Sequence, residues 1–315
     1  MNVLVTGGAG FIGSHLVRRL LVEGHAVTVL DDLNDFYDSA IKRENLQNLG
    51  GAAEMIEADV CDVAKVQSIF REGKFAAVVH LAARAGVRPS IQQPRLYLET
   101  NVTGTFNLLE AAHQSGVERF LFASSSSVYG LAKEVPFRED MPLLQTLSPY
   151  AATKLAGEQL CGNFSNLHSL RTVCLRFFTV YGPAQRPDLA IHKFTDSIFR
   201  GKAIPKFGDG LTRRDYTYVD DIVSGILGAL SYQGERFDIF NLGENETTTL
   251  NELIAAIESA LGKSAVIEQL PEQPGDMPLT CADISKARRL LNYQPRTPIS
   301  EGIPKFVDWY LSRNS

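Results

Sequence analysis

The sequence predicts an α/β protein built on a doubly wound parallel sheet, followed by a smaller C-terminal α/β domain. Nearly continuous apolar runs alternate with helical segments as far as Phe177, which is typical of parallel strands covered on both faces. The first run breaks into glycines and then resumes as a helix, as a strand-turn-helix unit does. After Phe178 the proline, glycine and charge densities rise together, and this change indicates the second domain.

The predicted elements follow this alternation along the chain. Strands are expected at residues 3–6, 26–30, 54–58, 76–82, 119–124 and 171–177, with one more core strand at 237–242. Helices are expected at 14–23, 149–166, 250–261, 284–291 and 299–312, another ends near Arg200, and residues 212–219 are expected to be extended. We therefore predict one domain over residues 1–178, with a return segment near 215–243, and a second domain mainly over residues 179–315.

The composition is that of an ordinary globular protein, with 44% apolar and 21% charged residues. The net charge of −5 argues against a nucleic-acid partner, because phosphates are neutralised by a basic face. No stretch approaches the length of a membrane span, and a core strand begins almost at the first residue, so we expect no membrane segment, no signal peptide and a cytoplasmic location. The 4 cysteines and 6 histidines are scattered, which predicts free thiols and no metal site.

The segment from residue 3 to 13 has the spacing of a dinucleotide-binding turn. Gly7 allows a tight turn at the strand end, Gly10 lets the backbone approach a pyrophosphate, and Gly13 lets the helix pack close to the strand. The free amides and the positive dipole end of the helix then face the phosphates. A second strand follows the helix, and this context makes a dinucleotide the predicted ligand.

That second strand ends in Asp31 and Asp32, where a carboxylate binds the ribose hydroxyls of adenosine. Two adjacent acids with no arginine beside them would repel a ribose phosphate. The sequence therefore favours NAD over NADP, and the downstream Lys42 and Arg43 are the residues that argue the other way.

Residues that follow the other strands are further candidates, because ligands of such sheets bind beyond the carboxyl ends of the strands. Asp59 and Val60 follow the third strand, where a carboxylate is placed to accept from the adenine amino group. Small residues and two arginines follow the fourth strand at 81–88. The serine run at 124–127 follows the fifth, and at the end of a buried strand it indicates hydroxyl donors in a cleft rather than a linker.

Tyr150 and Lys154 lie one turn apart on a helix that Ser148 caps and Pro149 opens. A phenol that removes a proton from an alcohol must lose its own proton, although its unperturbed pKa is about 10. One positive charge ~4 Å away contributes ~4 kcal/mol at an effective dielectric constant of ~20, or about three pKa units. The lysine and an oxidised nicotinamide each supply such a charge. With a serine to hold the alcohol, the pattern predicts reversible hydride transfer beside a nicotinamide.

On these motifs together, the chain resembles the extended short-chain dehydrogenase/reductase family along nearly all of its length. The matching motifs are T-G-G-A-G-F-I-G at the start, Asp31, H-L-A-A at 80–83, Asn101, S-S-S-S-V-Y-G, Y-A-A-T-K and R-R-D-Y-T-Y-V-D-D at 213–221. The resemblance implies a Rossmann NAD-binding domain over residues 1–178 and a nucleotide-sugar-binding domain mainly over 179–315. It also implies a homodimer made from the helix bearing Tyr150 and the one near residues 96–115.

The resemblance assigns roles to individual residues. Ser125 corresponds to the triad hydroxyl, Tyr150 to the base and Lys154 to its activator. The implied NAD site consists of Gly7, Gly10, Phe11, Ile12, Gly13, Asp31, Asn34, Asp59, Val60, Leu81, Ala82, Ala83, Arg84, Asn101, Ala123, Tyr150, Lys154, Phe177 and Val180. The implied substrate site consists of Arg88, Ser125, Ser126, Ser127, Tyr150, Thr179, Arg186, Lys193, Phe207 by the base, Arg214 at the diphosphate and Asp276 at the nucleotide ribose.

Within the family the chain is most similar to the UDP-glucuronate 4-epimerases, in A-G-V-R-P-S, R-F-F-T-V-Y-G-P, R-P-D-L-A and Q-P-G-D. Thr179 and Gln273 stand where the galactose 4-epimerases have asparagine and arginine, which favours an acid sugar. The dehydratases carry Asp-Glu where this chain has Ser126-Ser127, and the decarboxylases carry glutamate at the position of Ser127. Neither acid is present here.

The resulting expectation is 4-epimerisation of UDP-glucuronate to UDP-galacturonate through a 4-keto sugar. This intermediate is a β-keto acid, so its carboxylate must be held, by neutral hydrogen bonds from Ser126, Ser127 and Thr179 and by the charge of Arg88 or Arg186. The alternatives are an epimerase for neutral UDP-glucose or UDP-N-acetylglucosamine, a UDP-glucuronate decarboxylase, a dehydrogenase with exchanging cofactor, and a non-catalytic dinucleotide sensor.

Overall fold

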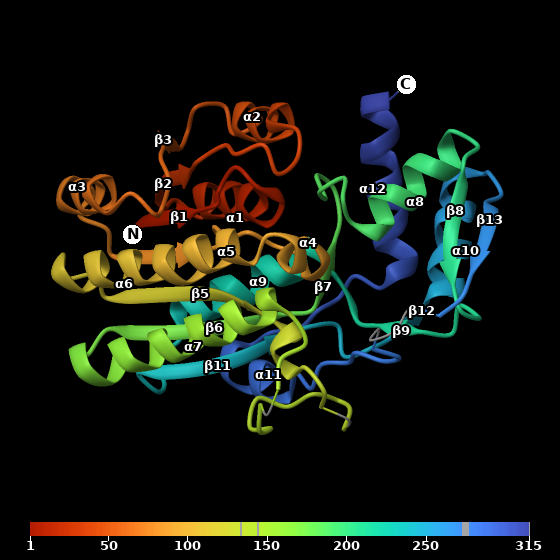
Figure 1. Ribbon diagram of the computed structural model, residues 1–315. Helices are drawn as coiled ribbons and strands as arrows, with labels where there is room; N and C mark the ends of the chain where they lie inside the picture. Colours follow the sequence, from red (N-terminus) through yellow and green to blue (C-terminus); the bar gives the residue numbers. More distant parts are fainter. Residues whose placement is uncertain (133, 144, 273–276, 315) are drawn as a thin grey trace.

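The computed structural model describes residues 1–132, 134–143, 145–272 and 277–314. Its largest element is a 7-stranded sheet in the order β11-β6-β5-β4-β1-β2-β3, and every pair of neighbours is parallel (Figure 1). The strands are β1 (Asn2–Thr6), β2 (Ala26–Asp31), β3 (Glu54–Glu57), β4 (Ala77–His80), β5 (Arg119–Ser125), β6 (Arg171–Phe177) and β11 (Phe237–Leu242). The predicted fold class is confirmed.

Helices cover both faces of this sheet because its strands alternate between two apolar cores. Val3 and Val5 of β1 share one core with α1 (Phe11–Val22) and α9 (Val219–Ser231). Leu4 belongs to the other core, which α3 (Val63–Gly73), α6 (Gly104–Gln114) and α7 (Pro149–His168) cover. The shorter helices are α2 (Ser39–Gln47), α4 (Val87–Gln92), α5 (Pro94–Leu98), the π-helix η1 (Glu99–Thr103) and the 3₁₀ helix η2 (Ser126–Tyr129).

The strand order reverses between β1 and β4. The chain runs from β1 to β2 and β3 on one side, and from β4 to β5, β6 and β11 on the other. Thr6 and His80, the last residues of β1 and β4, are paired at this point. In doubly wound sheets the ligand binds beyond the strand ends at such a reversal, so the topology itself locates the site.

A smaller group of elements lies beside the sheet, on the right of Figure 1. The parallel pair of β8 (Ala203–Phe207) and β13 (Val266–Leu270) packs there with α8 (Ala190–Phe199), α10 (Leu250–Leu261) and α12 (Ile299–Asn314). The remaining elements are β7 (Thr179–Tyr181), β9 (Arg213–Arg214), β10 (Tyr216–Tyr218), β12 (Thr248–Thr249) and α11 (Ser285–Leu291). Between β10 and β12 in the sequence, α9 and β11 return to the large sheet.

Three findings concern membrane spans, cysteines and metal ions. Within the ranges given above, no helix is long and apolar enough to cross a bilayer. Cys61, Cys161, Cys174 and Cys281 are free thiols. Among the described residues, no group of three or more His, Cys, Asp or Glu side chains is arranged to hold a metal ion.

The glycine turn between β1 and α1 is held by contacts that exclude side chains. Gly7 has a φ of +71°, and its amide donates to the carbonyl oxygen of Leu30 at 2.8 Å. A Cβ atom on Gly13 would lie 2.1 Å from the carbonyl oxygen of Gly7, so only glycine lets α1 start here. The first turn of α1 begins at Phe11 rather than at the predicted residue 14, because Gly10 takes the N-cap position.

We expect Gly13→Ala to lower the free energy of unfolding by about 1–3 kcal/mol, because the added methyl group meets backbone atoms that cannot rotate away. Urea unfolding followed by circular dichroism measures the change. Gly162→Ala is the control: its Cβ would meet only the Phe237 ring, at 3.3 Å, and alanine favours the helix. Equal destabilisation by the two substitutions would contradict this account.

Candidate active site

A cavity of about 340 Å³ opens beyond the carboxyl ends of the central strands, at the reversal of strand order. Most of the residues predicted for a cofactor and several predicted for a substrate line it. These are Gly7, Gly10, Phe11, Ile12, Gly13, Asp31, Asn34, Asp59, Val60, Leu81, Ala82, Ala83, Arg84, Ala123, Ser125, Tyr150, Lys154, Phe177, Thr179, Val180 and Arg186.

Asp31 lies at one end of the cavity, where β2 ends. Its carboxylate accepts hydrogen bonds from the amides of Leu33 at 3.0 Å and Ala9 at 3.2 Å, and Lys42 Nζ lies 3.6 Å from Oδ1. Burial raises the pKa of Asp31, and the charge of Lys42 works against that rise. Lys42 is itself buried over the ring of Tyr37, so its charge is directed at Asp31 rather than at solvent.

Tyr150 and Lys154 lie at the opposite end of the cavity, on the first turns of α7. The Ser148 hydroxyl accepts from the Ala151 amide at 3.1 Å, which is the predicted N-cap. Lys154 Nζ donates to the carbonyl oxygen of Ala123 at 2.7 Å and lies 5.9 Å from the centre of the Tyr150 ring. Complete burial lowers the pKa of Lys154 to about 8.

The serines after β5 orient one another. The backbone amide and the hydroxyl of Ser127 both donate to Ser125 Oγ, at 3.2 and 2.9 Å, so the proton of Ser125 is directed elsewhere. Ser125 in turn is hydrogen-bonded to Tyr150. Burial raises the pKa of Tyr150, while the Ser125 hydrogen bond and the charge of Arg186 lower it. The net direction is upward, so the protein groups by themselves do not bring the phenol near neutrality, contrary to the sequence-based expectation.

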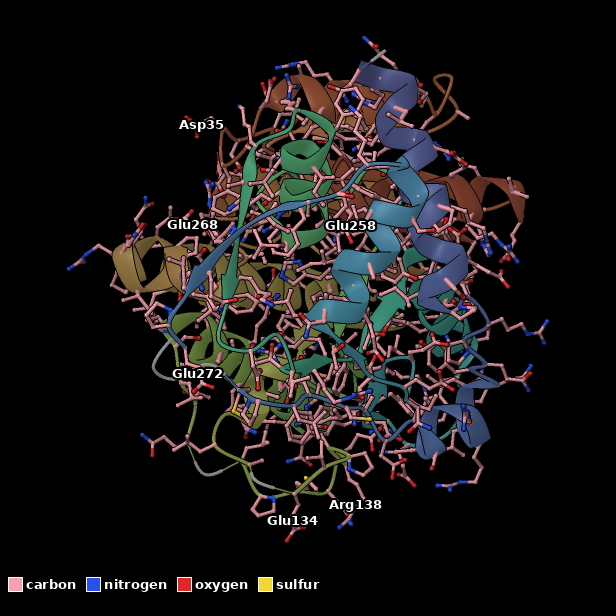
Figure 2. The ribbon with its side chains drawn as sticks, turned by 90° about the vertical axis from the view of Figure 1, so that its right-hand side faces the viewer. Asp35, Glu134, Arg138, Glu258, Glu268 and Glu272 are labelled. Atoms are coloured by element: carbon pink, nitrogen blue, oxygen red, sulfur yellow. The ribbon has the colours of Figure 1, made fainter. Side chains whose placement is uncertain are left out.

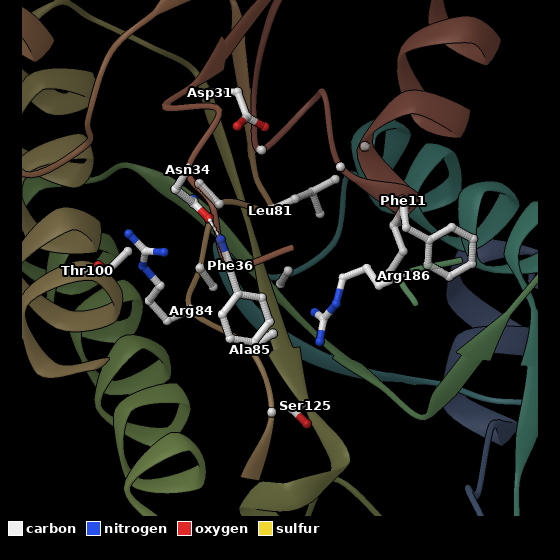
Figure 3. Close-up of a pocket in the computed structure, with 18 of the residues that line it drawn as sticks. Phe11, Asp31, Asn34, Phe36, Leu81, Arg84, Ala85, Thr100, Ser125 and Arg186 are labelled. Carbon is white, nitrogen blue, oxygen red and sulfur yellow. Dashed lines mark hydrogen bonds between the residues drawn. The ribbon is translucent and has the colours of Figure 1, made fainter. Parts of the chain in front are cut away.

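Arg186 enters the cavity from the segment between β7 and α8. Its Nε and Nη2 donate to the two carboxylate oxygens of Asp188 at 2.8 and 2.7 Å. The guanidinium carbon lies 5.2 Å from the centre of the Phe36 ring. Figure 3 shows this ring between the side chains of Arg84 and Arg186, with Ser125 beyond them.

His80 joins the strand ends beneath the cavity. The Thr6 hydroxyl pairs with His80 Nδ1 at 2.7 Å, and Thr105 Oγ1 lies 2.9 Å from His80 Nε2. Because Thr105 donates its own proton to the Asn101 carbonyl, Nε2 is assigned as the donor and the ring as neutral. Burial, and then the charge of Lys154, lower the pKa of His80 to about 3.

Asn101 does not line the cavity, although it was predicted as a cofactor contact. It lies in η1, where its side chain accepts from the Arg84 amide at 2.8 Å and donates to the Arg84 carbonyl at 2.9 Å and to Thr153 at 3.1 Å. Asn101 therefore holds the loop after β4 against α7. Its effect on a cofactor would pass through the position of Arg84.

Other predicted residues also lie outside the cavity lining. Ser126 and Ser127 begin η2, Arg88 lies in α4 and Lys193 in α8. Phe207 ends β8 and Arg214 lies in β9, in the smaller group of elements. Asp276 and Gln273 fall outside the described residues. The lining also includes Asp32, Lys42, Ala85, Gly86 and Ser124, which lie in segments that the sequence had indicated. It further includes residues that the sequence did not single out, namely Leu30, Phe36, Tyr37, Ala58, Thr100, Phe178 and Leu189.

The fold and this cavity define a nucleotide-binding α/β protein with a tyrosine-lysine pair at the ligand site. Residues 3–243 match the model of the NAD dependent epimerase/dehydratase family, and the chain belongs to this family. UDP-glucuronate 4-epimerase of Thermodesulfobacterium geofontis is 42% identical over 309 residues, which cover 97% of this chain and 95% of that protein. UDP-glucuronate 4-epimerase 2 of Arabidopsis thaliana is 40% identical over 330 residues, which cover 99% of this chain and 76% of that protein.

Two solved structures of 4-epimerases are also similar to this chain over nearly its whole length. The UDP-glucuronic acid 4-epimerase of Bacillus cereus in complex with UDP-glucuronic acid and NAD superposes with a TM-score of 0.92 and 36% identity, covering 99% of this chain and 100% of that one. The UDP-glucose 4-epimerase of Thermotoga maritima with UDP-glucose has a TM-score of 0.91 and 34% identity, and both chains are covered completely, at 100%.

The neutrality of His80 gives the protein a specific sensitivity to acid. Its folded-state pKa of about 3 lies below the unfolded value of about 6.5, so the unfolded chain binds more protons between these values. Stability is therefore lost as the pH falls below about 6.5, by up to about 1.4 kcal/mol per pH unit. In His80→Gln this slope, measured by urea unfolding at several pH values, is expected to be shallower by that amount.

Phe120→Leu is the control for this experiment, because Phe120 packs against the His80 ring but does not titrate. It is expected to lower stability by the same amount at every pH. A wild-type slope in His80→Gln would contradict the assignment of a neutral buried imidazole.

Proposed function

We propose that this chain catalyses NAD-dependent 4-epimerisation of a UDP-sugar, converting UDP-glucuronate to UDP-galacturonate with retention of the carboxylate. The observation that carries this proposal is the meeting of Ser125, Tyr150 and Arg186 in one cavity with the glycine turn. Three of the similar proteins reported above are named UDP-glucuronate 4-epimerases, which supports the same reaction. The protein of Thermotoga maritima is named a UDP-glucose 4-epimerase, which is the reaction of the neutral-sugar alternative.

The cavity fits a dinucleotide at its glycine end. A Cβ atom on Gly7 would lie 2.7 Å from the Ala82 amide nitrogen, so the turn leaves room only for backbone. The N-cap of α1 makes no side-chain hydrogen bond, which leaves the amides of the first turn free for phosphate oxygens. Arg84 Nε is buried without a partner, and a ligand oxygen would satisfy it.

Asp31 is the residue that favours NAD over NADP. Its carboxylate faces the cavity, and a ribose phosphate there would be repelled. Lys42, the cation that argued the other way, is 3.6 Å from this carboxylate. We therefore assign Asp31 to the ribose hydroxyls and Lys42 to supporting Asp31.

The catalytic roles follow from the other end of the cavity. NAD bound here would supply a hydride acceptor for carbon 4 of the sugar, and a hydride donor for the opposite face once the keto sugar has turned over. Tyr150 accepts the proton of the 4-hydroxyl and later gives it back, and Ser125 holds the oxygen in place. Lys154 remains charged below about pH 8 and stabilises the phenolate from beneath the ring. Thr179 and Arg186 line the same cavity and are assigned to the sugar.

Tyr150→Phe tests this assignment. Removing the proton acceptor is expected to lower kcat by about 10²–10⁴-fold, as for other general bases. Conversion of UDP-glucuronate is followed by NMR of the sugar products, without added reductant. Tyr97→Phe is the matched control, because Tyr97 stacks edge-on at 6.2 Å from Tyr150 but donates to the Ala85 carbonyl. Its kcat is expected to change by less than about tenfold, since one neutral hydrogen bond is lost.

The products distinguish the alternatives. UDP-pentose as the main product would identify a decarboxylase, and turnover of UDP-glucose alone would identify an epimerase for neutral sugars. A Tyr150→Phe protein with wild-type activity would contradict catalysis at this site and favour a dinucleotide sensor. A requirement for added NAD at every turnover would indicate a dehydrogenase with exchanging cofactor.

We further propose that the protein is a homodimer formed by the face of α5, α6 and α7. Leu98, Phe106 and Leu167 on these helices are exposed by 55%, 42% and 70%, which is unusual for large apolar side chains gathered on adjacent helices. The face also carries the Phe106–Phe164 ring contact. Burial of these side chains in a twofold contact would account for them.

Phe106→Glu is expected to convert the dimer to a monomer in sedimentation-velocity measurements, because it places a charge on this apolar face. Leu211→Glu introduces the same charge at a 61% exposed leucine in the smaller group of elements and is expected to leave the dimer intact. A monomeric wild-type protein would contradict the proposal.

A cytoplasmic location is proposed on the chemistry of the cysteines. All 4 are unpaired, including the buried Cys161 and Cys174, as is usual in a reducing compartment.

A further inference from the structure

Arg186 is presented to the cavity in one defined orientation. The pair with Asp188 uses the Nε hydrogen and one Nη2 hydrogen, in the fork-to-fork geometry that fixes a guanidinium plane. The Nη1 hydrogens and the other Nη2 hydrogen therefore form the edge that Asp188 does not use. Figure 3 shows the Arg186 side chain extending toward the region of Ser125.

The geometry of Asp188 is suited to hold Arg186 rather than to meet a ligand. Asp188 follows Arg186 by two residues, and the Leu189 amide closes this turn on the Arg186 carbonyl at 3.2 Å. Although burial opposes it, the hydrogen bonds and charge of Arg186 lower the pKa of Asp188, so this carboxylate stays ionised. Arg186 and Leu189 line the cavity, whereas Asp188 does not.

Charge at this place matters for a 4-keto hexuronate. In such an intermediate the bond between carbon 5 and the carboxyl carbon can break, and its electron pair then moves into the 4-ketone as an enolate. Carbon dioxide leaves, and the enolate takes a proton at carbon 5. A guanidinium paired with the carboxylate stabilises the charged reactant more than the neutral carbon dioxide, and therefore raises the barrier to this loss.

We propose that Asp188 is a positioning residue that determines specificity: it orients Arg186 so that the free guanidinium edge pairs with the sugar carboxylate and suppresses decarboxylation. The inference rests on the proposed function, because it concerns an acid sugar oxidised at carbon 4. It gives a role to Asp188, which the sequence marks only as part of the motif R-P-D-L-A, and it places Arg186 at the carboxylate rather than at the diphosphate.

Asp188→Asn is the principal test. Asparagine keeps the size of the side chain but lacks the charge and one acceptor, so the two-bond pair cannot form. Asp188 is about one-third exposed, at 34%, and folding should tolerate the change. We expect the ratio of UDP-pentose to UDP-galacturonate formed from UDP-glucuronate to rise on the order of tenfold, since a charge-assisted hydrogen bond is lost. NMR of the products gives this ratio independently of the amount of folded protein.

Binding measurements separate the carboxylate from the diphosphate. In a Tyr150→Phe background, where turnover is blocked, Asp188→Asn is expected to raise the Kd for UDP-glucuronate on the order of tenfold and to leave that for UDP-glucose unchanged. Equal weakening of the two ligands would overturn the proposal, because both carry the same diphosphate. Calorimetry on the protein with its NAD supplies both constants.

A double-mutant cycle shows whether Asp188 acts through Arg186. Arg186→Lys keeps the charge but cannot form the fork, and it should by itself increase UDP-pentose. Adding Asp188→Asn to Arg186→Lys should then change the product ratio by less than about twofold. Additive effects of the two substitutions would show that Asp188 acts independently of Arg186, and would overturn the proposal.

The matched control is Asp140→Asn. Asp140 pairs with Arg138 Nε at 3.0 Å, with the same spacing of two residues but on an exposed loop. Figure 2 shows Arg138 at the bottom of the molecule and Asp35, the neighbour of the cavity residue Phe36, near the top. This substitution should leave the product ratio unchanged.

Wild-type protein that does not convert UDP-glucuronate refutes the proposed function, whereas conversion with a wild-type ratio in Asp188→Asn refutes only the present inference.

Discussion

The hydrogen bond from Lys154 Nζ to the carbonyl oxygen of Ala123, at 2.7 Å, is the contact on which the site depends. It ties the first turns of α7 to the end of β5 and so sets Tyr150 against Ser125 and the strand ends. Burying an ammonium group costs free energy because its charge leaves water, and the same burial lowers the pKa of Lys154 to about 8. The same ammonium joins two elements and lies 5.9 Å from the centre of the Tyr150 ring.

A second buried network supports this contact from behind. Glu158, one turn after Lys154, accepts from the Ser124 hydroxyl at 2.5 Å and from Arg176 Nε and Nη2 at 2.9 and 2.8 Å. Arg176 continues to the Tyr129 hydroxyl at 3.1 Å, and Tyr129 donates to Asn241 at 2.6 Å. Burying the ion pair costs desolvation free energy, which its hydrogen bonds offset in part. Here they fix α7 relative to β5, β6 and β11.

The two ends of the cavity offer different chemical groups to a ligand. At the glycine end the backbone approaches closely, and the groups offered are amides and the carboxylates of Asp31, Asp32 and Asp59. At the far end the groups are a phenol, hydroxyls and the guanidinium of Arg186. Arg84, whose Nη2 lies 3.6 Å from Asp32 Oδ2, comes from a segment on the opposite side of the cavity (Figure 3). Arg186 belongs to the segment between β7 and α8, which is not part of the large sheet. In the proposed function, the group that contacts the sugar is therefore carried by a segment outside the dinucleotide-binding strands and helices.

Much of this was predictable from the sequence, for identifiable reasons. Strands at 171–177 and 237–242 and the helix at 250–261 have their predicted bounds, because burial on both faces or on one stripe leaves a clear apolar pattern. Local chemistry also determined the cap at Ser148, the glycine turn and the spacing of Tyr150 and Lys154. By contrast, β13 is mostly exposed, and with its partner β8 it lacks the apolar run that would have predicted a strand. Phe36 and Tyr37 carry no pattern that marks them as cavity residues.

The sequence by itself therefore determined the elements and the residue types that the chemistry needs, since both depend on neighbours along the chain. Only the tertiary structure decided how those groups are paired: Asn101 with the Arg84 backbone, Ser127 with Ser125, and Lys42 with Asp31. The direction of each pKa shift was decided there too. Burial and hydrogen bonding depend on which distant segments come together, and no local pattern encodes that proximity.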